Sequence, residues 1–106
     1  MTIETVLSST RMIPVLTINR VEDAVPLCTT LVEAGLLVLE ITLRTAPALA
    51  AVAAAAKALP EATIGVGTLL DSADFARARD AGALFAVSPG LNMDLVDNAK
   101  AAGINY

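Results

Sequence analysis

The sequence contains no histidine, no tryptophan and a single cysteine, Cys28. Without histidine, histidine-based catalytic triads are excluded, and the commonest general base and the usual metal ligand are both missing. One cysteine can form neither an intrachain disulfide nor a cysteine-cluster zinc site, so we interpret Cys28 as a small buried hydrophobe. We therefore expect no metal site.

Basic stretches, aromatic residues and long apolar runs are also scarce. The net charge is −4 and aromatic residues make up 3% of the chain, so nucleic acid is not an expected partner. No apolar run reaches the roughly 18 residues of a membrane span, so no membrane association is expected. The first residues lack the basic and apolar regions of a secretory signal, and we expect a cytoplasmic protein.

The length of 106 residues predicts one domain over residues 1–106. This is well short of the roughly 250 residues of a closed eight-fold βα barrel. Apolar residues make up 56% of the chain, but alanine supplies much of that share, which predicts close packing of small side chains.

Strand-like and helix-like patterns alternate from end to end. Strands are predicted over residues 13–18, 37–43, 62–66 and 84–87, with the first residues of a fifth at 104–106. Helices are predicted between them, beginning near residues 21, 48, 71 and 93, and Ala-Gly pairs at 34–35, 81–82 and 102–103 end three of them. This alternation is typical of βαβ units with a parallel sheet.

The second predicted strand has an acid inside an apolar run. Alternation along the strand places Glu40, Thr42 and Arg44 on one side and the leucines and isoleucine between them on the other. Strands this hydrophobic are usually covered on both faces, so the carboxylate needs a partner or a purpose.

Two interpretations of Glu40 and Arg44 follow from these residues alone. Desolvation would raise the pKa of Glu40 and suit it to proton transfer, while the Arg44 guanidinium holds a substrate carboxylate. Alternatively, the two side chains merely neutralise each other as a structural ion pair.

Other unusual residues follow the third and fourth predicted strands. In parallel βα architectures, the reactive surface lies at the carboxyl ends of the strands. Gly65 and Gly67 are expected to let a ligand approach the backbone, and Thr68 offers a hydroxyl beside them. The turn of Ser88, Pro89 and Gly90 ends the fourth strand.

Three segments make a family resemblance recognisable: LEITLRT at 39–45, GVGTLL at 65–70 and VSPGL at 87–91. In this order and spacing they closely resemble the 2-keto-3-deoxy-6-phosphogluconate (KDPG) aldolase family, which includes 4-hydroxy-2-oxoglutarate (KHG) aldolases. The resemblance covers nearly the whole chain. It implies the amino-terminal half of a (βα)8 TIM barrel, with four βα units plus the start of strand five.

The resemblance also implies an activity, that of a class I aldolase that forms a Schiff base. Such an enzyme cleaves KDPG to pyruvate and glyceraldehyde 3-phosphate, and many members also split KHG into pyruvate and glyoxylate. By motif match, Glu40 takes the general acid/base position, Arg44 and Thr68 take positions that bind the pyruvate carboxylate and nearby oxygens, and Pro89 lines the pocket. No cofactor is expected, and a keto acid is the expected small-molecule partner.

The family's Schiff-base lysine and phosphate-binding residues have no counterpart in this sequence. Lys57 and Lys100 both fall on predicted helices, where a solvated ammonium is expected. The alternative is therefore a truncated or engineered half-barrel fragment without catalytic activity. Four strands of an open barrel expose two edges and an apolar face, so a homo-oligomer is expected, and the family resemblance suggests a trimer.

Overall fold

The computed structural model describes residues 2–69 and 71–106. Met1 and Leu70, the last residue of the predicted GVGTLL motif, lie outside the described residues. The elements follow the order α1 (Ile3–Ser8), β1 (Val15–Leu16), η1 (Val21–Asp23), α2 (Ala24–Glu33), β2 (Val38–Thr42), α3 (Ala48–Ala58), β3 (Thr63–Gly67), α4 (Ser72–Ala81), β4 (Phe85–Ala86) and α5 (Met93–Ala102).

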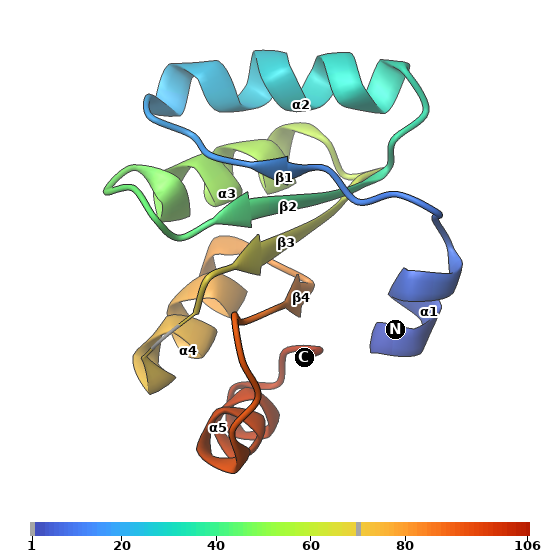
Figure 1. Cartoon of the computed structure of the whole chain (residues 1–106). Coiled ribbons are helices and arrows are strands. Elements are labelled where there is room, and N and C mark those ends of the chain that lie inside the picture. The colour runs from blue at the N-terminus through green and yellow to red at the C-terminus, as the bar shows by residue number, and fades with distance from the viewer. Residues whose placement is uncertain (1, 70) are drawn as a thin grey trace.

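The sheet has the sequential strand order β1-β2-β3-β4, and every neighbouring pair is parallel. A doubly wound sheet would reverse its strand order in the middle and carry helices on both faces. Here α3 and its neighbours α2 and α4 form one layer, and α5 packs on α4 (Figure 1). This is the arrangement of a singly wound βα barrel segment, as predicted.

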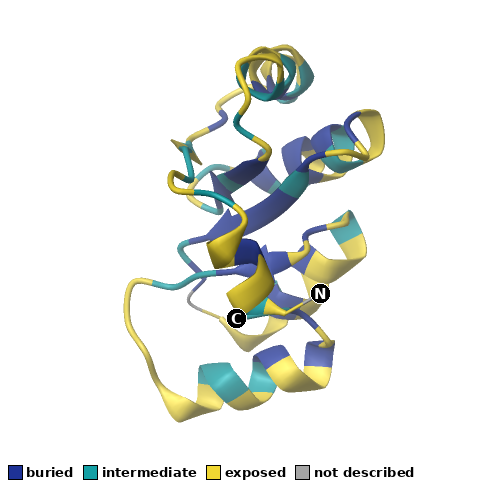
Figure 2. Ribbon diagram, turned by 90° about the vertical axis from the view of Figure 1, so that its right-hand side faces the viewer, coloured by how far each residue is buried: buried dark blue, intermediate teal, exposed yellow. Residues whose placement is uncertain are grey.

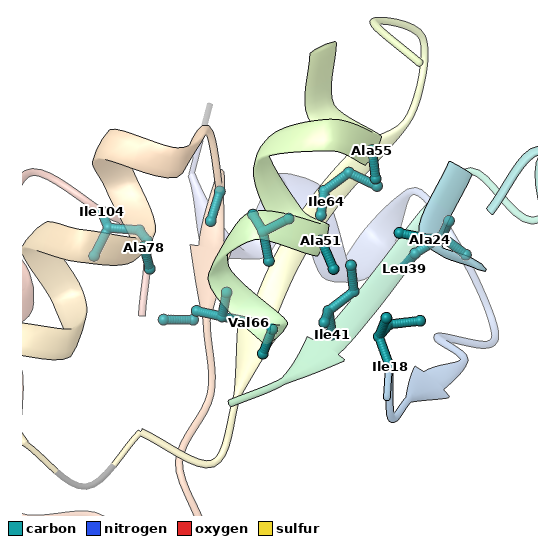
Figure 3. Packing of buried hydrophobic residues seen from close by; sticks show 14 of the residues in the cluster. Ile18, Ala24, Leu39, Ile41, Ala51, Ala55, Ile64, Val66, Ala78 and Ile104 are labelled. Atoms are coloured by element: carbon teal, nitrogen blue, oxygen red, sulfur yellow. The ribbon is translucent and has the colours of Figure 1, made fainter. Parts of the chain in front are cut away.

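The outer face of the sheet is buried under alanine-rich helices. Leu39 and Ile41 of β2 and Ile64 and Val66 of β3 form one apolar cluster with buried alanines of α3 (Figure 3). Small side chains let the helix axis approach the sheet closely, as the composition predicted. Burial is greatest in β2, β3 and β4 and on the helix surfaces that face them, whereas β1 is partly exposed (Figure 2).

The inner face has a second, smaller cluster, and it includes a helix that the sequence patterns did not predict. Val6 of α1 packs with Val38 and Phe85, which lie on the inner face of the sheet. The helix lies toward the amino ends of the strands (Figure 1). Its one sequence signal is Thr2, whose hydroxyl accepts a hydrogen bond from the Thr5 amide at 3.2 Å.

The regular strands are shorter than predicted at the edges of the sheet. β1 and β4 have two paired residues each, whereas β2 and β3 have five. The predicted fifth strand is present as a single parallel bridge between Phe85 and Asn105. Within residues 2–69 and 71–106, no helix is long and apolar enough to cross a membrane.

Helix α4 begins where the sequence predicted, near residue 71, and its first turn forms a capping box. The Asp71 carboxylate accepts a hydrogen bond from the Ala73 amide at 2.9 Å, and the Asp74 carboxylate accepts one from the Asp71 amide at 3.3 Å. At the other end, Gly82 adopts a left-handed conformation with φ of 104°. Both ends of the helix are thus fixed by local sequence.

Replacing Asp71 with alanine should therefore destabilise the chain. Loss of an N-cap acid costs about 1 kcal/mol, which lowers the Tm by about 4 to 8 °C in a domain near this size. Thermal unfolding followed by circular dichroism measures the change. Asp97→Ala, which removes an exposed acid from within α5, is the matched control and should shift the Tm much less. Equal shifts for the two variants would contradict the capping role.

Candidate active site

The candidate residues come from β2 and from the turns that follow β2, β3 and β4. Glu40 lies within β2 and Arg44 in the turn after it, Thr68 directly follows β3, and Pro89 lies in the turn after β4. Because the strands are parallel, these turns lie at the same edge of the sheet.

Glu40 lies on the inner face of the sheet. Its register neighbours are Val15 in β1 and Gly65 in β3. The side chain is half-buried. It lies over β3, as shown by the overlap that a Cβ atom placed on Gly67 would make with the Glu40 carboxylate. The acid therefore lies between the apolar cluster of Val38 and Phe85 and the carboxyl ends of the strands.

Two opposing effects act on the Glu40 carboxyl. Burial is the larger one and raises its pKa above the ordinary value of 4.5, because the charged form loses solvation. The positive charge of Arg44 opposes that rise. The net shift of the Glu40 pKa is upward.

Arg44 contacts Thr68 rather than the acid. The Arg44 Nε atom donates a hydrogen bond to Thr68 Oγ1 at 3.3 Å. In the described part of the chain, Glu40 and Arg44 are not among the ion pairs with N···O distances of 4.0 Å or less. The interpretation as a contact ion pair was therefore wrong, and the exposed guanidinium has donors free for an anion.

Thr68 has a strained backbone. Its φ of 62° is left-handed, and among the described residues it is the one non-glycine with a positive φ. This conformation is rare for a β-branched residue and costs on the order of 1 to 2 kcal/mol. No sequence pattern signals this strain, which places the Thr68 hydroxyl beside Arg44.

The glycines of β3 have a different role from the one predicted. A Cβ atom on Gly65 would overlap the Phe85 ring, and one on Gly67 would overlap the Glu40 carboxylate. The expectation that these glycines leave room for a ligand was therefore wrong for the chain as it stands. The room is occupied by two side chains of the neighbouring strands.

Pro89 lies apart from the other three predicted residues. It lines a hollow of about 510 Å³ between the turn after β4 and α5, together with Leu91, Val96 and Tyr106. The Ser88 hydroxyl donates a hydrogen bond to the Gly90 carbonyl at 2.7 Å and is hydrogen-bonded to the Tyr106 hydroxyl. The structure thus brings Arg44 and Thr68 into contact, with Glu40 on the inner face of the same strand pair. Pro89 lines a separate hollow.

Thr42 supports the site and was noted in the sequence only for its position on the same side of β2. It is buried, and its hydroxyl donates a hydrogen bond to the Leu16 carbonyl at 3.1 Å. The Thr17 hydroxyl lies 3.3 Å from the same Thr42 oxygen atom. These contacts fix the end of β1 against β2, next to the turn that carries Arg44.

Both lysines of the chain lie on helices, away from Glu40, Arg44 and Thr68. Lys57 is exposed in the last turn of α3, and Lys100 is exposed in the last turn of α5, at the rim of the hollow near Pro89. Within residues 2–69 and 71–106, no group of three or more potential ligands could hold a metal ion. What the arrangement offers is an acid with a raised pKa beside an arginine and a hydroxyl.

Fold and site together define a βα-barrel segment with an acid, an arginine and a hydroxyl toward the carboxyl ends of its strands. The family model for KDPG and KHG aldolases matches residues 3–106, and the chain belongs to that family. A 2-dehydro-3-deoxy-phosphogluconate aldolase of Pseudoalteromonas atlantica is 44% identical over 99 residues, covering 93% of this chain and 46% of the relative.

Solved structures agree with this assignment. The KDPG aldolase of Zymomonas mobilis ATCC 29191 matches with a TM-score of 0.91 and 41% identity, over 98% of this chain and 50% of that one. The KDPG aldolase of Legionella pneumophila, solved with pyruvate captured as a covalent carbinolamine, matches with a TM-score of 0.83 and 39% identity, over 88% of this chain and 45% of that one. The chain therefore spans about half the length of the relatives it matches.

Arg44→Gln should raise the pKa of Glu40 further, because the variant removes the positive charge that lowers it. The titration midpoint of the Glu40 side-chain carboxyl, followed by ¹³C NMR, measures the shift. Arg20→Gln is the control, since Arg20 is exposed and pairs with Glu22 at 3.0 Å. A midpoint that stays unchanged or falls in Arg44→Gln would show that the guanidinium does not act on Glu40.

Proposed function

We propose that this chain is the acid/base and carboxylate-binding half of an aldolase that cleaves KDPG to pyruvate and glyceraldehyde 3-phosphate. The same site would split KHG into pyruvate and glyoxylate. The observation that carries the proposal is the half-buried Glu40 carboxylate, with its raised pKa, at the edge where Arg44 and Thr68 are hydrogen-bonded.

Each residue has a role in this chemistry that its surroundings support. Cleavage through a Schiff base needs a proton at the carbonyl oxygen as the imine forms and a proton removed from the hydroxyl as the carbon–carbon bond breaks. Glu40 would carry these protons, since its raised pKa brings the two protonation states closer in energy near neutral pH.

Arg44 and Thr68 would hold the carboxylate of the keto acid. A guanidinium binds a carboxylate through two parallel hydrogen bonds, and Arg44 is exposed, with only its Nε engaged by Thr68. The strained backbone of Thr68 fixes the hydroxyl where a second oxygen of the substrate would lie. Pro89 lines the separate hollow after β4, so its place in the wall of the substrate pocket stays a prediction.

The nucleophile would come from a lysine outside residues 1–106. An imine-forming lysine must be desolvated, and both lysines of this chain are exposed on helices. The Legionella pneumophila relative was solved with pyruvate captured as a covalent carbinolamine, which supports amine-based covalent chemistry for the longer polypeptide rather than for this half alone.

The second candidate is a half-barrel fragment without activity, and the same placement of the lysines is consistent with it. β1 and β4 are the outermost strands of the sheet, and Val15 of β1 is 62% exposed. Such edge strands support association with further copies of the chain. A trimer stays a prediction, and so does a cytoplasmic location.

The test is pyruvate release from KDPG by a polypeptide that carries this chain together with the carboxyl-terminal half of its barrel. Glu40→Gln should lower kcat by about 10² to 10⁴-fold, because the amide cannot exchange the proton. Glu61→Gln, which alters an exposed acid before β3, should retain activity. Full activity in Glu40→Gln would refute the role of the acid.

Incubation of the isolated 106-residue chain with pyruvate and borohydride tests whether either lysine of this chain is the nucleophile. No gain in mass is expected, because neither exposed lysine can form the imine. An adduct on Lys57 or Lys100 would show that the nucleophile is within this chain.

A further inference from the structure

The two glycines on the inner face of β3 each face a side chain from a different neighbouring strand. Phe85 of β4 lies over Gly65, and the Glu40 carboxylate of β2 lies over Gly67. Since alternate residues of a strand share a face, the two glycines lie about 6.6 Å apart along β3. The Phe85 ring and the Glu40 carboxylate thus lie one after the other along the part of β3 that has no inward side chains.

The backbone does not require glycine at position 67. Its φ lies outside the left-handed range, in contrast to Gly35, Gly82 and Gly103. Glycine within a strand loses both conformational entropy and packing, so it marks a close approach by another group. The three atoms that a Cβ on Gly67 would meet first all belong to Glu40.

Little else fixes the carboxylate where it lies. In the described part of the chain, its side-chain oxygens take part in no hydrogen bond and in no ion pair within 4.0 Å. Its register neighbours Val15 and Gly65 carry no charge, and Arg44 is the charged group that acts on it. The shape of the surface under the carboxylate therefore decides its position.

We propose that Gly67 is a positioning residue for Glu40: its lack of a side chain forms the seat in which the catalytic carboxylate lies against the inner wall of the sheet. The role in catalysis rests on the proposed function, whereas the seat itself is a property of this chain. A methyl group at position 67 would push the carboxylate off β3, toward water and Arg44.

The first test is a double-mutant cycle between positions 40 and 67, measured as Tm in the 106-residue chain. Gly67→Ala should lower the Tm relative to the same change in a Glu40→Ala background, because only in the unaltered chain must the flexible Glu40 side chain move aside for the methyl group. In the Glu40→Ala background the same change should leave the Tm unchanged or raise it, since alanine reduces the entropy of the unfolded chain. If Gly67→Ala alone fails to fold, the double variant should recover folding.

The second test is the titration of Glu40 by ¹³C NMR. In Gly67→Ala the midpoint should fall toward 4.5, because the displaced carboxylate regains solvent. Gly90→Ala is the matched control: a Cβ there meets nothing within 4 Å, and neither the Tm nor the midpoint should change appreciably.

An equal loss of Tm in both backgrounds, an unfolded double variant or an unchanged midpoint would each overturn the proposal. Neither measurement needs an active enzyme, so these outcomes are independent of the aldolase assay. In the active polypeptide, Gly67→Ala should lower kcat more than it changes KM, because the acid is displaced while Arg44 and Thr68 still bind the substrate carboxylate.

Discussion

The organisation of this molecule depends on close packing around β3, which carries large side chains on its outer face and glycines on its inner face. On the outer face, Ile64 and Val66 are buried under the alanine-rich helix α3. On the inner face, Gly65 and Gly67 leave room for Phe85 and Glu40. A strand that is bulky outside and bare inside suits a sheet that curves around an interior, because inner side chains are crowded there.

The same constraint sets the electrostatics of the site. Phe85 fills the lower part of the interior with Val38 and Val6, and Glu40 lies directly above this apolar cluster. Burial then raises the pKa of the acid, and the turns after β2 and β3 carry Arg44 and Thr68. An apolar cluster, an acid and an arginine bonded to a hydroxyl thus follow one another toward the carboxyl ends of the strands.

The fold could be predicted from the sequence because its signals are local. Alternating apolar patterns, the Asp71 cap and the left-handed glycines each depend on a few neighbouring residues, and the structure confirms them. Helix α1 was missed because it is short and is stabilised by Val6 contacting Val38 and Phe85, which are distant in sequence. Long-range packing of this kind leaves no periodic signal in six residues.

The positions of the candidate residues in the fold could be predicted from the sequence, and their contacts could not. Arg44, Thr68 and Pro89 lie in turns after successive strands, and Glu40 lies within β2 on its inner face, as motif and topology predicted. The Arg44 to Thr68 contact, the strain at Thr68 and the occupied glycines depend on side-chain directions across three strands, which no linear pattern specifies. Their roles in catalysis stay predictions, as does the single domain over residues 1–106.

The central claim is that burial on the inner wall makes Glu40 a proton-transfer group. The most direct test is the ¹³C-detected titration midpoint of Glu40 in the unaltered chain. We expect a midpoint above 4.5, because desolvation outweighs the positive charge of Arg44. A midpoint at or below 4.5 would contradict the claim, since the carboxylate would then be a solvated or ion-paired group on an open sheet.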